Sequence, residues 1–310
     1  MKRMLVVGAA GQIGSELVPK LREEYGNDNV VATFHRVKKK FAEPVEALDV
    51  LDRNRLEEII DRYDIDTVFH LGAILSVKGE QNPQLCFKVN IDGLYNILEV
   101  AKEKGVEKVI APSSIAAFGP ETPDNPTEIT IQRPNTIYGI SKVLQELLGG
   151  YYFDRYGLDI RGVRFPGIIS WKTQPGGGTT DYAVAAFYEA IRDGHYTYFV
   201  RKDTVLPMMY MPDALKALIE LAEAKPSGLR YRFYNVTAMS FSAEELTETI
   251  KKFIPEFTVD YKADERQKIA DSWPKRLNDG AARKDWGWKP EWDLERMAGD
   301  MIENLSAPGT

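Results

Sequence analysis

Runs of apolar residues alternate with stretches of helical periodicity over the first half of the chain. Continuous aliphatic and β-branched runs are typical of strands buried at the centre of a parallel sheet. Such runs predict strands at residues 3–7, 30–34, 67–71, 108–111 and 159–164, with a shorter one before residue 49. Apolar residues three and four apart predict helices after residue 14, through Leu56, Ile59 and Ile60, over 83–104 and over 133–156. This alternation predicts an α/β fold built on a doubly wound parallel sheet.

The pattern changes beyond Pro166. A loop rich in glycine and threonine occupies residues 171–181, and the elements that follow it are short and isolated. We therefore expect two regions. Residues 1–166 form the domain with the parallel sheet, to which some later segments return, and residues 167–310 mainly form a smaller lobe that lies over the sheet edge.

A glycine-rich turn follows the first predicted strand. Gly8, Gly11 and Gly14 have the spacing G-x-x-G-x-x-G and lead into an amphipathic helix that carries Leu17 and Leu21. Strand, glycine turn and helix in this order are the context of a dinucleotide-binding, or Rossmann, fingerprint. Glycines let the backbone approach a pyrophosphate, and the helix N-terminus offers free N–H groups and the positive end of its dipole. The first domain is therefore predicted to bind a dinucleotide.

The second predicted strand lacks the acidic residue that normally holds the adenosine ribose, about 20 residues beyond the glycines. Phe34 stands at the end of this strand, and Arg36 follows it. Arg36 is either a ligand for a 2′-phosphate or an exposed basic residue of a loop, so these residues leave NAD and NADP open. Asp49, after the third strand, is placed to approach the adenine edge or to cap the next helix.

Tyr138 and Lys142 lie near the start of the predicted 133–156 helix, four residues apart and hence on one face. A lysine ammonium there favours the phenolate and is expected to lower the phenol pKa toward working pH. Such a tyrosine can exchange a proton with an alcohol during oxidation or reduction. Tyr198 and Lys202 have the same spacing, so spacing alone does not identify a site.

Three segments with suitable chemistry are expected to meet at the carboxyl edge of the sheet, where ligands bind in open α/β folds. They are the glycine turn, Ser114 after the fifth strand and Tyr138 on the next helix. Ser114 would hydrogen-bond the reacting oxygen, Tyr138 would carry the proton, and Lys142 would stabilise the phenolate and hold the nicotinamide ribose. The set predicts an alcohol–carbonyl redox site, and the lack of a G-x-S-x-G elbow disfavours hydrolysis.

Composition removes several other classes of function. The 310 residues carry a net charge of −6, which argues against nucleic-acid binding. Cys86 is the single cysteine, so an internal disulfide is impossible, and the histidines lie far apart, so no metal site is predicted. No uncharged stretch approaches the ~18 residues that span a bilayer, and we expect a cytoplasmic protein with no membrane span.

The chain resembles the extended short-chain dehydrogenase/reductase family over residues 3–305, through Gly8, Gly11 and Gly14, Asp49, His70–Ala73, Asn90, Ser113–Ser114, and Tyr138 with Lys142. Its second half resembles the threonine dehydrogenase branch at residues 166–170, 176–183, 206–211, 238–241, 273–274 and 282–288. The string G-G-G-T-T-D-Y-A at 176–183 is highly specific. The hydroxyl and N–H groups of Thr179 and Thr180 suit the carboxylate of a small zwitterion, and Asp181 suits its ammonium or orients the loop.

The resemblance implies NAD-dependent oxidation of L-threonine at its β-hydroxyl to 2-amino-3-oxobutyrate, with hydride transfer to nicotinamide. The implied catalytic residues are Ser114, Tyr138 as general base, and Lys142. The implied coenzyme ligands are Gly8, Gly11, Gln12, Ile13, Gly14, Arg36, Asp49, Val50, Leu71, Gly72, Ala73, Asn90, Tyr138, Lys142 and Pro166. The implied substrate ligands are Ser76, Ser114, Tyr138, Gly178, Thr179, Thr180, Asp181, Tyr210 and Trp273.

The resemblance also implies a homodimer that pairs helices 83–104 and 133–156 of the two subunits. Coupling to a 2-amino-3-oxobutyrate CoA ligase is a further hypothesis, because the β-keto acid product can lose CO₂ unless another enzyme consumes it. Two alternative functions stay open. The nearer one is an NAD-dependent nucleotide-sugar epimerase or dehydratase, and the more distant one is a non-catalytic dinucleotide-binding sensor.

Overall fold

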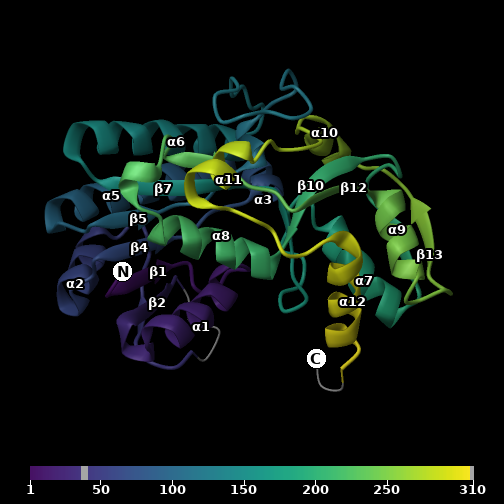
Figure 1. Cartoon of the computed structure of the whole chain (residues 1–310), viewed down its shortest axis with the longest axis horizontal. Coiled ribbons are helices and arrows are strands. Elements are labelled where there is room, and N and C mark those ends of the chain that lie inside the picture. The colour runs from purple at the N-terminus through teal and green to yellow at the C-terminus, as the bar shows by residue number, and fades with distance from the viewer. Residues whose placement is uncertain (36–40, 308–310) are drawn as a thin grey trace.

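A computed structural model describes residues 1–35 and 41–307 of the chain, and a large parallel sheet lies at one end of the molecule (Figure 1). Its strands are β1 (Met4–Val7), β2 (Val30–Phe34), β3 (Val45–Ala47), β4 (Thr67–His70), β5 (Lys108–Ile110), β6 (Ser113–Ser114), β7 (Asp159–Phe165) and β11 (Phe233–Asn235). They follow the order β11-β7-β5-β4-β1-β2-β3, and β6 pairs with the end of β7. The order runs outward from β1 in both directions, which confirms the doubly wound α/β fold.

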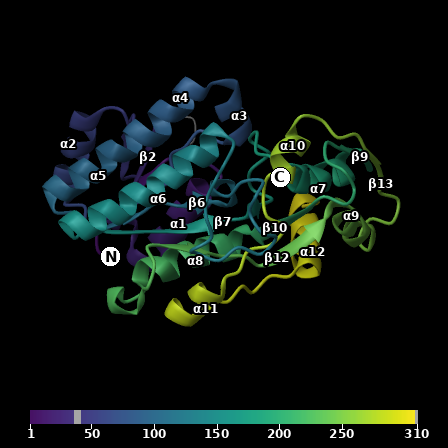
Figure 2. The same cartoon turned by 90° about the horizontal axis from the view of Figure 1, so that it is seen from above.

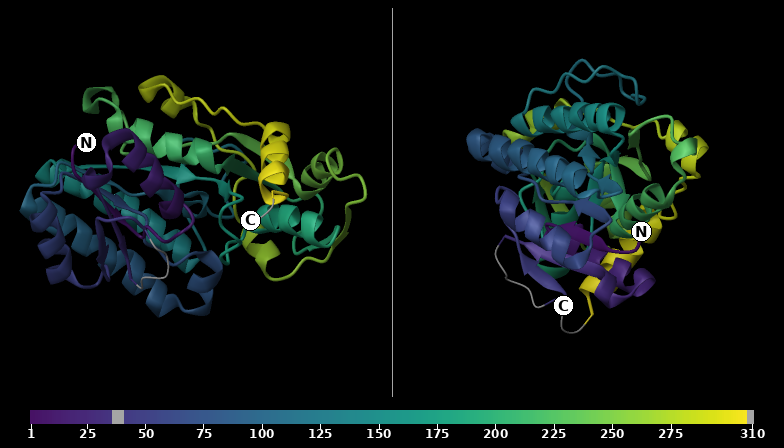
Figure 3. Two further views of the ribbon diagram at one scale, coloured as in Figure 1. Left: turned by 90° about the horizontal axis from the view of Figure 1, so that it is seen from below. Right: turned by 90° about the vertical axis from the view of Figure 1, so that its left-hand side faces the viewer.

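Helices cover both faces of this sheet, as the right panel of Figure 3 shows. One face packs against α1 (Gly14–Tyr25), α8 (Met211–Glu223) and α11 (Gly280–Trp286), and the other against α2 (Arg53–Tyr63), α5 (Gly93–Lys104) and α6 (Ile137–Tyr156). The sheet strands are buried from both sides, which explains their continuous apolar sequences. None of the helices in the described ranges combines the length and the apolar character that crossing a bilayer requires.

A second region lies at the opposite end of the molecule (Figure 2). It contains β8 (Gly167–Ile169), α7 (Tyr182–Arg192), β9 (His195–Tyr198), β10 (Val205–Tyr210), β12 (Met239–Ser242), α9 (Ala243–Lys251), β13 (Thr258–Tyr261), α10 (Arg266–Asp271) and α12 (Leu294–Leu305). These elements share an apolar core, which also includes Cys86, Ile115, Ala116, Phe118 and Tyr138 from the first half of the chain. The division of the chain near residue 166 stays a prediction, and three later elements, α8, β11 and α11, pack against or join the large sheet.

The helix predicted over 83–104 is interrupted, which the periodicity did not reveal. It consists of α4 (Pro83–Phe87), a π-helical turn over Lys88–Asp92, and α5. A short helix, α3 (Ser76–Gln81), precedes it and was also not predicted. The π turn carries Asn90, whose amide group bonds the backbone of Ile74. Such turns are frequent at functional sites.

The helix expected from residue 133 begins later, at Ile137. Pro134 disfavours helical geometry at the residue before it. The Thr136 side chain then caps the helix by accepting a hydrogen bond from the N–H of Gly139 at 3.1 Å, and Glu80 of α3 accepts from the N–H of Ile137 at 2.8 Å. These two caps set the start of α6 one residue before Tyr138.

The close packing of β7 can be tested at a glycine. A Cβ at Gly162 would collide with the carbonyl oxygen of Ala111 and the ring of Phe233, and the backbone oxygen cannot rotate away. We expect Gly162→Ala to lower the free energy of unfolding by roughly 1–3 kcal/mol, measured by urea denaturation. The control is Gly150→Ala on α6, where nothing lies within 4 Å and helix propensity predicts a gain of about 0.5–1 kcal/mol. Equal effects of the two changes would contradict this packing.

Candidate active site

The glycine turn after β1 lies against the turn after β4 too closely for side chains. Gly8 has φ +83°, and a Cβ there would lie 2.8 Å from the backbone nitrogen of Gly72. A Cβ at Gly14 would lie 2.8 Å from Cα of Ala9. Gly11 and Gln12 lie in the turn between them, which leads directly into α1. This exposed backbone at a helix N-terminus fits the pyrophosphate of a dinucleotide.

A mainly apolar cavity opens on one side of the glycine turn, at the carboxyl ends of β1, β3 and β4. The predicted coenzyme ligands that line it are Gly8, Asp49, Val50, Gly72 and Ala73. Asp49 accepts a hydrogen bond from the N–H of Leu51 at 3.0 Å, and its other carboxylate oxygen lies 3.4 Å from Nδ1 of His35. The site thus offers an apolar slot with one carboxylate at its mouth, which fits an adenosine.

The ribose position shows an aromatic contact instead of a hydrogen-bond acceptor. Phe34 is 4% exposed, and its ring stacks on that of Phe41 with 5.9 Å between centroids. Arg36, the candidate for a 2′-phosphate, lies outside the described residues, so its role stays a prediction. Phe34 itself supplies no acceptor for a ribose hydroxyl, and the Asp49 carboxylate lies beside the adjacent His35.

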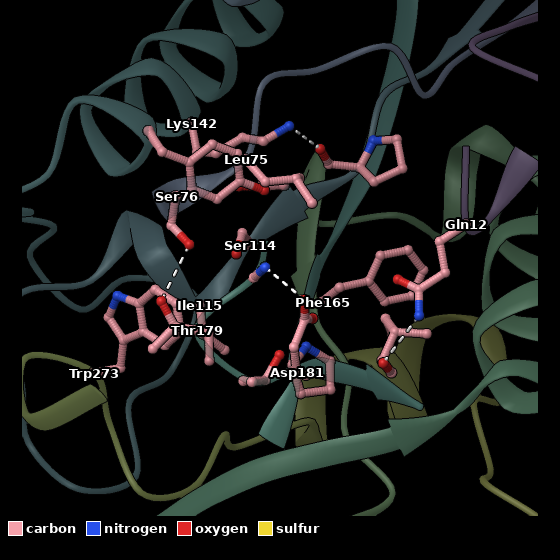
Figure 4. A pocket seen from close by; sticks show the side chains of 18 of the residues that line it. Gln12, Leu75, Ser76, Ser114, Ile115, Lys142, Phe165, Thr179, Asp181 and Trp273 are labelled. Carbon is pink, nitrogen blue, oxygen red and sulfur yellow. Dashed lines mark hydrogen bonds between the residues drawn. The ribbon is translucent and has the colours of Figure 1, made fainter. Parts of the chain in front are cut away.

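A second cavity lies between the sheet edge and the second region, and Figure 4 shows its lining. Ser114, Tyr138 and Lys142 meet there, as predicted from their places at strand and helix ends. The other predicted ligands in its wall are Gln12, Ile13, Pro166, Ser76, Gly178, Thr179, Thr180, Asp181 and Trp273. The side chain of Gln12 donates to the carbonyl of Ile168 at 3.3 Å, which ties the glycine turn to the segment after Pro166.

Tyr138 is almost completely buried in this wall, and burial raises its pKa to about 12, against a hydrogen bond with Ser114 that lowers it. The expectation that Lys142 lowers the tyrosine pKa toward neutral pH is therefore wrong for this structure. The ammonium lies 5.6 Å from the ring centroid and donates instead to the carbonyl of Pro112 at 2.7 Å and to Oε1 of Gln145 at 3.0 Å. Removal of both groups from water favours their neutral forms, and it lowers the pKa of Lys142 to about 8.

Asn90 holds the backbone of a segment next to the cavities. Its side chain accepts from the N–H of Ile74 at 2.8 Å and donates to the carbonyl of the same residue at 3.0 Å. It lines neither of the two cavities described above. Leu71 belongs to the same turn and packs on the core beneath it. Asn90 therefore fixes the backbone segment that carries Ser76 into the cavity wall.

The loop rich in glycine and threonine forms another part of the wall of this cavity. The hydroxyl groups of Ser76 and Thr179 lie 3.1 Å apart, within hydrogen-bonding distance. The Asp181 carboxylate accepts from the N–H groups of Gly177 at 2.7 Å and Gly178 at 2.8 Å, and burial raises the pKa of Asp181 against these bonds. Two roles were left open for Asp181: attracting a substrate ammonium and orienting the loop. These bonds to the loop backbone show the second role.

The structure does not bring Tyr210 to the cavity. Its hydroxyl donates to Asp300 of α12, and its ring packs edge-on against Trp292 with 4.9 Å between centroids. The expectation that Tyr210 binds substrate is therefore not supported by its position. Side chains alternate along β10, and the last position of that strand faces α12 instead of the cavity.

Several wall residues were not among the predicted ligands, although Ser113, Gly167 and Ile168 lie in segments that carry the family resemblance. They are Leu75, Pro112, Ser113, Ile115, Phe165, Gly167 and Ile168. Most are apolar residues at or near strand ends, and their composition does not distinguish them from the core. Their position at the carboxyl edge of the sheet was the available signal. Among the described residues, no group of three or more acidic, histidine or cysteine side chains is arranged to hold a metal ion.

Comparison with known proteins places these features in context. A model of the NAD dependent epimerase/dehydratase family matches residues 4–237. An uncharacterized epimerase/dehydratase of Staphylococcus saprophyticus is 46% identical over 312 residues, which is 98% of this chain and 97% of that protein.

Three solved structures of L-threonine dehydrogenases are also similar over nearly the whole chain. The protein from Clostridium difficile is 50% identical, with a TM-score of 0.97 over 99% of this chain and 98% of the other. The protein from Phytophthora infestans is 47% identical, with a TM-score of 0.96 over 98% of each chain. A monomeric L-threonine 3-dehydrogenase from a metagenome is 47% identical, with a TM-score of 0.94 over 97% of this chain and 98% of the other.

The buried ammonium of Lys142 makes a prediction for stability. A change from the ordinary pKa of 10.5 to about 8 means that the folded protein pays about 3 kcal/mol to keep this lysine charged. The unfolded chain binds the extra proton between pH 8 and 10.5, so stability from this group rises with pH across that window.

We therefore expect Lys142→Met to be relatively more stable at pH 7 than at pH 10.5. The difference in unfolding free energy between variant and wild type, measured by urea denaturation, should be about 3 kcal/mol more favourable to the variant at the lower pH. The lost bonds to Pro112 and Gln145 affect both pH values, so comparing the two pH values isolates the charge. A difference that does not change with pH would show that the ammonium is not desolvated.

Proposed function

Because the chain belongs to the NAD dependent epimerase/dehydratase family, we propose that it is an oxidoreductase that converts L-threonine and NAD to 2-amino-3-oxobutyrate and NADH. The observation that carries this proposal is the convergence of Ser114, Tyr138 and the Ser76–Thr179 pair on one small cavity. The similarity to L-threonine dehydrogenases over nearly the whole chain supports the same substrate.

The coenzyme would lie along the carboxyl edge of the sheet. The backbone of the glycine turn would hold its pyrophosphate, and Asp49, Val50 and Ala73 would surround its adenosine. Lys142 would hold the nicotinamide ribose, with Pro166 beside the ring. When bound, the coenzyme supplies the acceptor for the hydride that leaves the β-carbon of threonine.

Tyr138 and Ser114 would handle the proton of the substrate hydroxyl. The Ser114 hydroxyl binds the substrate oxygen, and the Tyr138 phenolate takes the proton as the carbon–oxygen double bond forms. Burial raises the pKa of Tyr138 to about 12, so forming the phenolate costs more here than in water. The hydrogen bond from Ser114 offsets part of this cost, and activity should rise with pH until Lys142 begins to lose its proton, near pH 8.

The remaining wall suits a small polar substrate. The hydroxyls of Ser76, Thr179 and Thr180 can bind the carboxylate of an amino acid, while Asp181 keeps the loop in place. Trp273, which is 9% exposed, covers the cavity from the second region. Together these residues would exclude water from the path of the hydride, which prevents side reactions with solvent. NAD is the proposed coenzyme, and NADP stays the alternative because Phe34 replaces the usual acidic residue.

The reaction can be tested by the absorbance of reduced coenzyme with L-threonine, run in parallel with NAD and NADP. We expect turnover with NAD. We also expect Tyr138→Phe to lower kcat by about 10²–10⁴-fold while the dissociation constant for NADH is unchanged, because only proton transfer is lost.

The matched control is Tyr198→Phe, since Tyr198 and Lys202 repeat the same spacing. Tyr198 lies in β9, where its hydroxyl accepts from Thr247 and its ring stacks on Tyr261 at 5.2 Å, and it does not line the cavity. This variant should keep full activity. No turnover by folded protein with either coenzyme would refute the proposed reaction, and conversion of UDP-sugars instead would establish the epimerase alternative.

We also propose that the protein forms a homodimer through α4, α5 and α6. Apolar side chains that remain exposed on these helices are Phe87 at 46%, Tyr95 at 48%, Ile140 at 47%, Leu147 at 65% and Tyr151 at 53%. Exposed apolar clusters of this kind mark interaction surfaces. A 2-amino-3-oxobutyrate CoA ligase is the proposed consumer of the β-keto acid product.

A charge at the centre of this surface should disrupt the dimer. We expect Leu147→Glu to elute as a 35.0 kDa monomer in size-exclusion chromatography with light scattering, whereas wild type should have twice that mass. Phe253→Glu, at an apolar residue 43% exposed in the second region, is the control and should remain dimeric. A monomeric wild type would reject the dimer without affecting the proposed reaction.

A further inference from the structure

The short segment that carries Ser114 depends on side chains of α6 for its position. The strand β6 has two residues and pairs with β7, at Ser113 with Arg164 and at Ser114 with Phe165. Gln145 donates from Nε2 to the carbonyls of Ala111 at 2.8 Å and Pro112 at 3.0 Å. So short a strand has little hydrogen bonding of its own, which makes these side-chain bonds important for the geometry of the site.

The strongest of these attachments is a buried ion pair. Glu146 accepts a hydrogen bond from the Ser113 hydroxyl at 2.5 Å and binds Arg164 through two nitrogens, with Nη2 to Oε2 at 2.6 Å and Nε to Oε1 at 2.9 Å. The Glu146 and Arg164 side chains are only 7% and 5% exposed. Gln132 also donates to the carboxylate, at 3.0 Å. Removing one partner of such a pair leaves an uncompensated buried charge.

Arg164 extends the attachment away from the cavity. Its Nη1 donates to Oδ1 of Asn235 in β11 at 3.3 Å and to the carbonyl of Glu128 at 3.2 Å. Asn235 in turn donates to the carbonyl of Pro126 at 2.9 Å. The ion pair therefore joins β6, α6, β11 and the connection before α6 at a single buried point.

Glu146 also faces Lys142, which lies one turn earlier on α6. Burial lowers the pKa of Lys142, and the Glu146 carboxylate opposes this by favouring the ammonium. The other titratable side chains facing this ammonium are His70 at the end of β4, Cys86 of α4 and Tyr138 of α6. Burial lowers the pKa of His70 to about 3, so it stays neutral, and Glu146 is the carboxylate of this group.

We propose that Glu146 and Arg164 are positioning residues that hold Ser114 at its working distance from Tyr138 and keep Lys142 charged. They act through Ser113 and through the electric field at Lys142, and neither lines the cavity itself. The inference uses the proposed threonine oxidation for its kinetic test, and NADH binding provides a measurement that does not depend on threonine.

Changes of Glu146 and of Arg164 should shift the alkaline limb of the pH profile in opposite directions. This limb is the range in which the measured quantity falls as Lys142 loses its proton. Glu146→Gln removes the carboxylate that favours the Lys142 ammonium, so the lysine loses its proton at lower pH. We expect the alkaline limbs of kcat/KM and of NADH affinity to move down by roughly one pH unit. Arg164→Met leaves the carboxylate in place and should move both limbs up.

The attachment of Ser114 can be tested separately. Ser113→Ala keeps the ion pair but removes the bond from the serine strand to Glu146. We expect kcat to fall about tenfold, with the NADH dissociation constant and the alkaline limb unchanged, because positioning of reacting groups is lost without a change of charge. This variant retains the buried pair and keeps the proposal testable if the charge variants fold poorly.

Arg161→Met is the matched control on the same strand. Arg161 is completely buried and paired with Asp159 at 2.6 Å, but it holds the carbonyls of Leu221 and Ala224 at the far end of α8. The Arg161→Met change should lower the melting temperature without changing kcat and without shifting the alkaline limb of kcat/KM or of NADH affinity. Equal pH profiles for wild type, Glu146→Gln and Arg164→Met, with an unchanged kcat in Ser113→Ala, would overturn the proposal. If the pH profiles of NADH affinity shift in a protein that does not oxidise threonine, the charge effect would be retained and the proposed reaction would be rejected.

Discussion

Burial of a lysine ammonium beside a phenol is the physical constraint around which the catalytic cavity is arranged. Both groups prefer their neutral forms when removed from water, and neither neutral group alone supports proton transfer from an alcohol. The surrounding residues work against this preference. The carbonyl of Pro112 and the amide of Gln145 satisfy the ammonium, Glu146 adds a negative charge one turn away, and Ser114 stabilises the phenolate of Tyr138.

This requirement links the chemistry to the sheet. Pro112, Ser113 and Ser114 follow β5, so the carbonyl that holds Lys142 and the hydroxyl that meets Tyr138 come from one short segment. The caps of α6 by Thr136 and Glu80 set where Tyr138 starts the first turn. A small displacement of either the segment or the helix would misalign reacting groups, and such misplacements have large effects on rate. Stability and catalytic geometry are thus provided by the same buried contacts.

The second region determines which molecules can enter this cavity. Its glycine- and threonine-rich loop is held by Asp181 through backbone N–H groups, and the Thr179 hydroxyl meets that of Ser76 from the first half of the chain. The coenzyme cradle and the Ser114–Tyr138–Lys142 set suit oxidation of many alcohols, since fold and chemistry do not by themselves select a substrate. In the proposed reaction, selection of a small zwitterion would therefore rest on the loop and on Trp273, so that reaction depends on both regions.

Local sequence was enough to predict the sheet, the glycine turn and the meeting of Ser114 with Tyr138, because strand periodicity and the carboxyl-edge rule depend on neighbours in the chain. It could not predict the interruption at Lys88–Asp92, the contact of Tyr210 with α12, or the pKa of Tyr138. Those depend on residues distant in sequence: the turn after β4 that Asn90 holds, the Asp300 that Tyr210 meets, and the walls that exclude water from Tyr138 and Lys142. Desolvation and side-chain pairing are sums over the whole three-dimensional surroundings, so tertiary structure alone decided them.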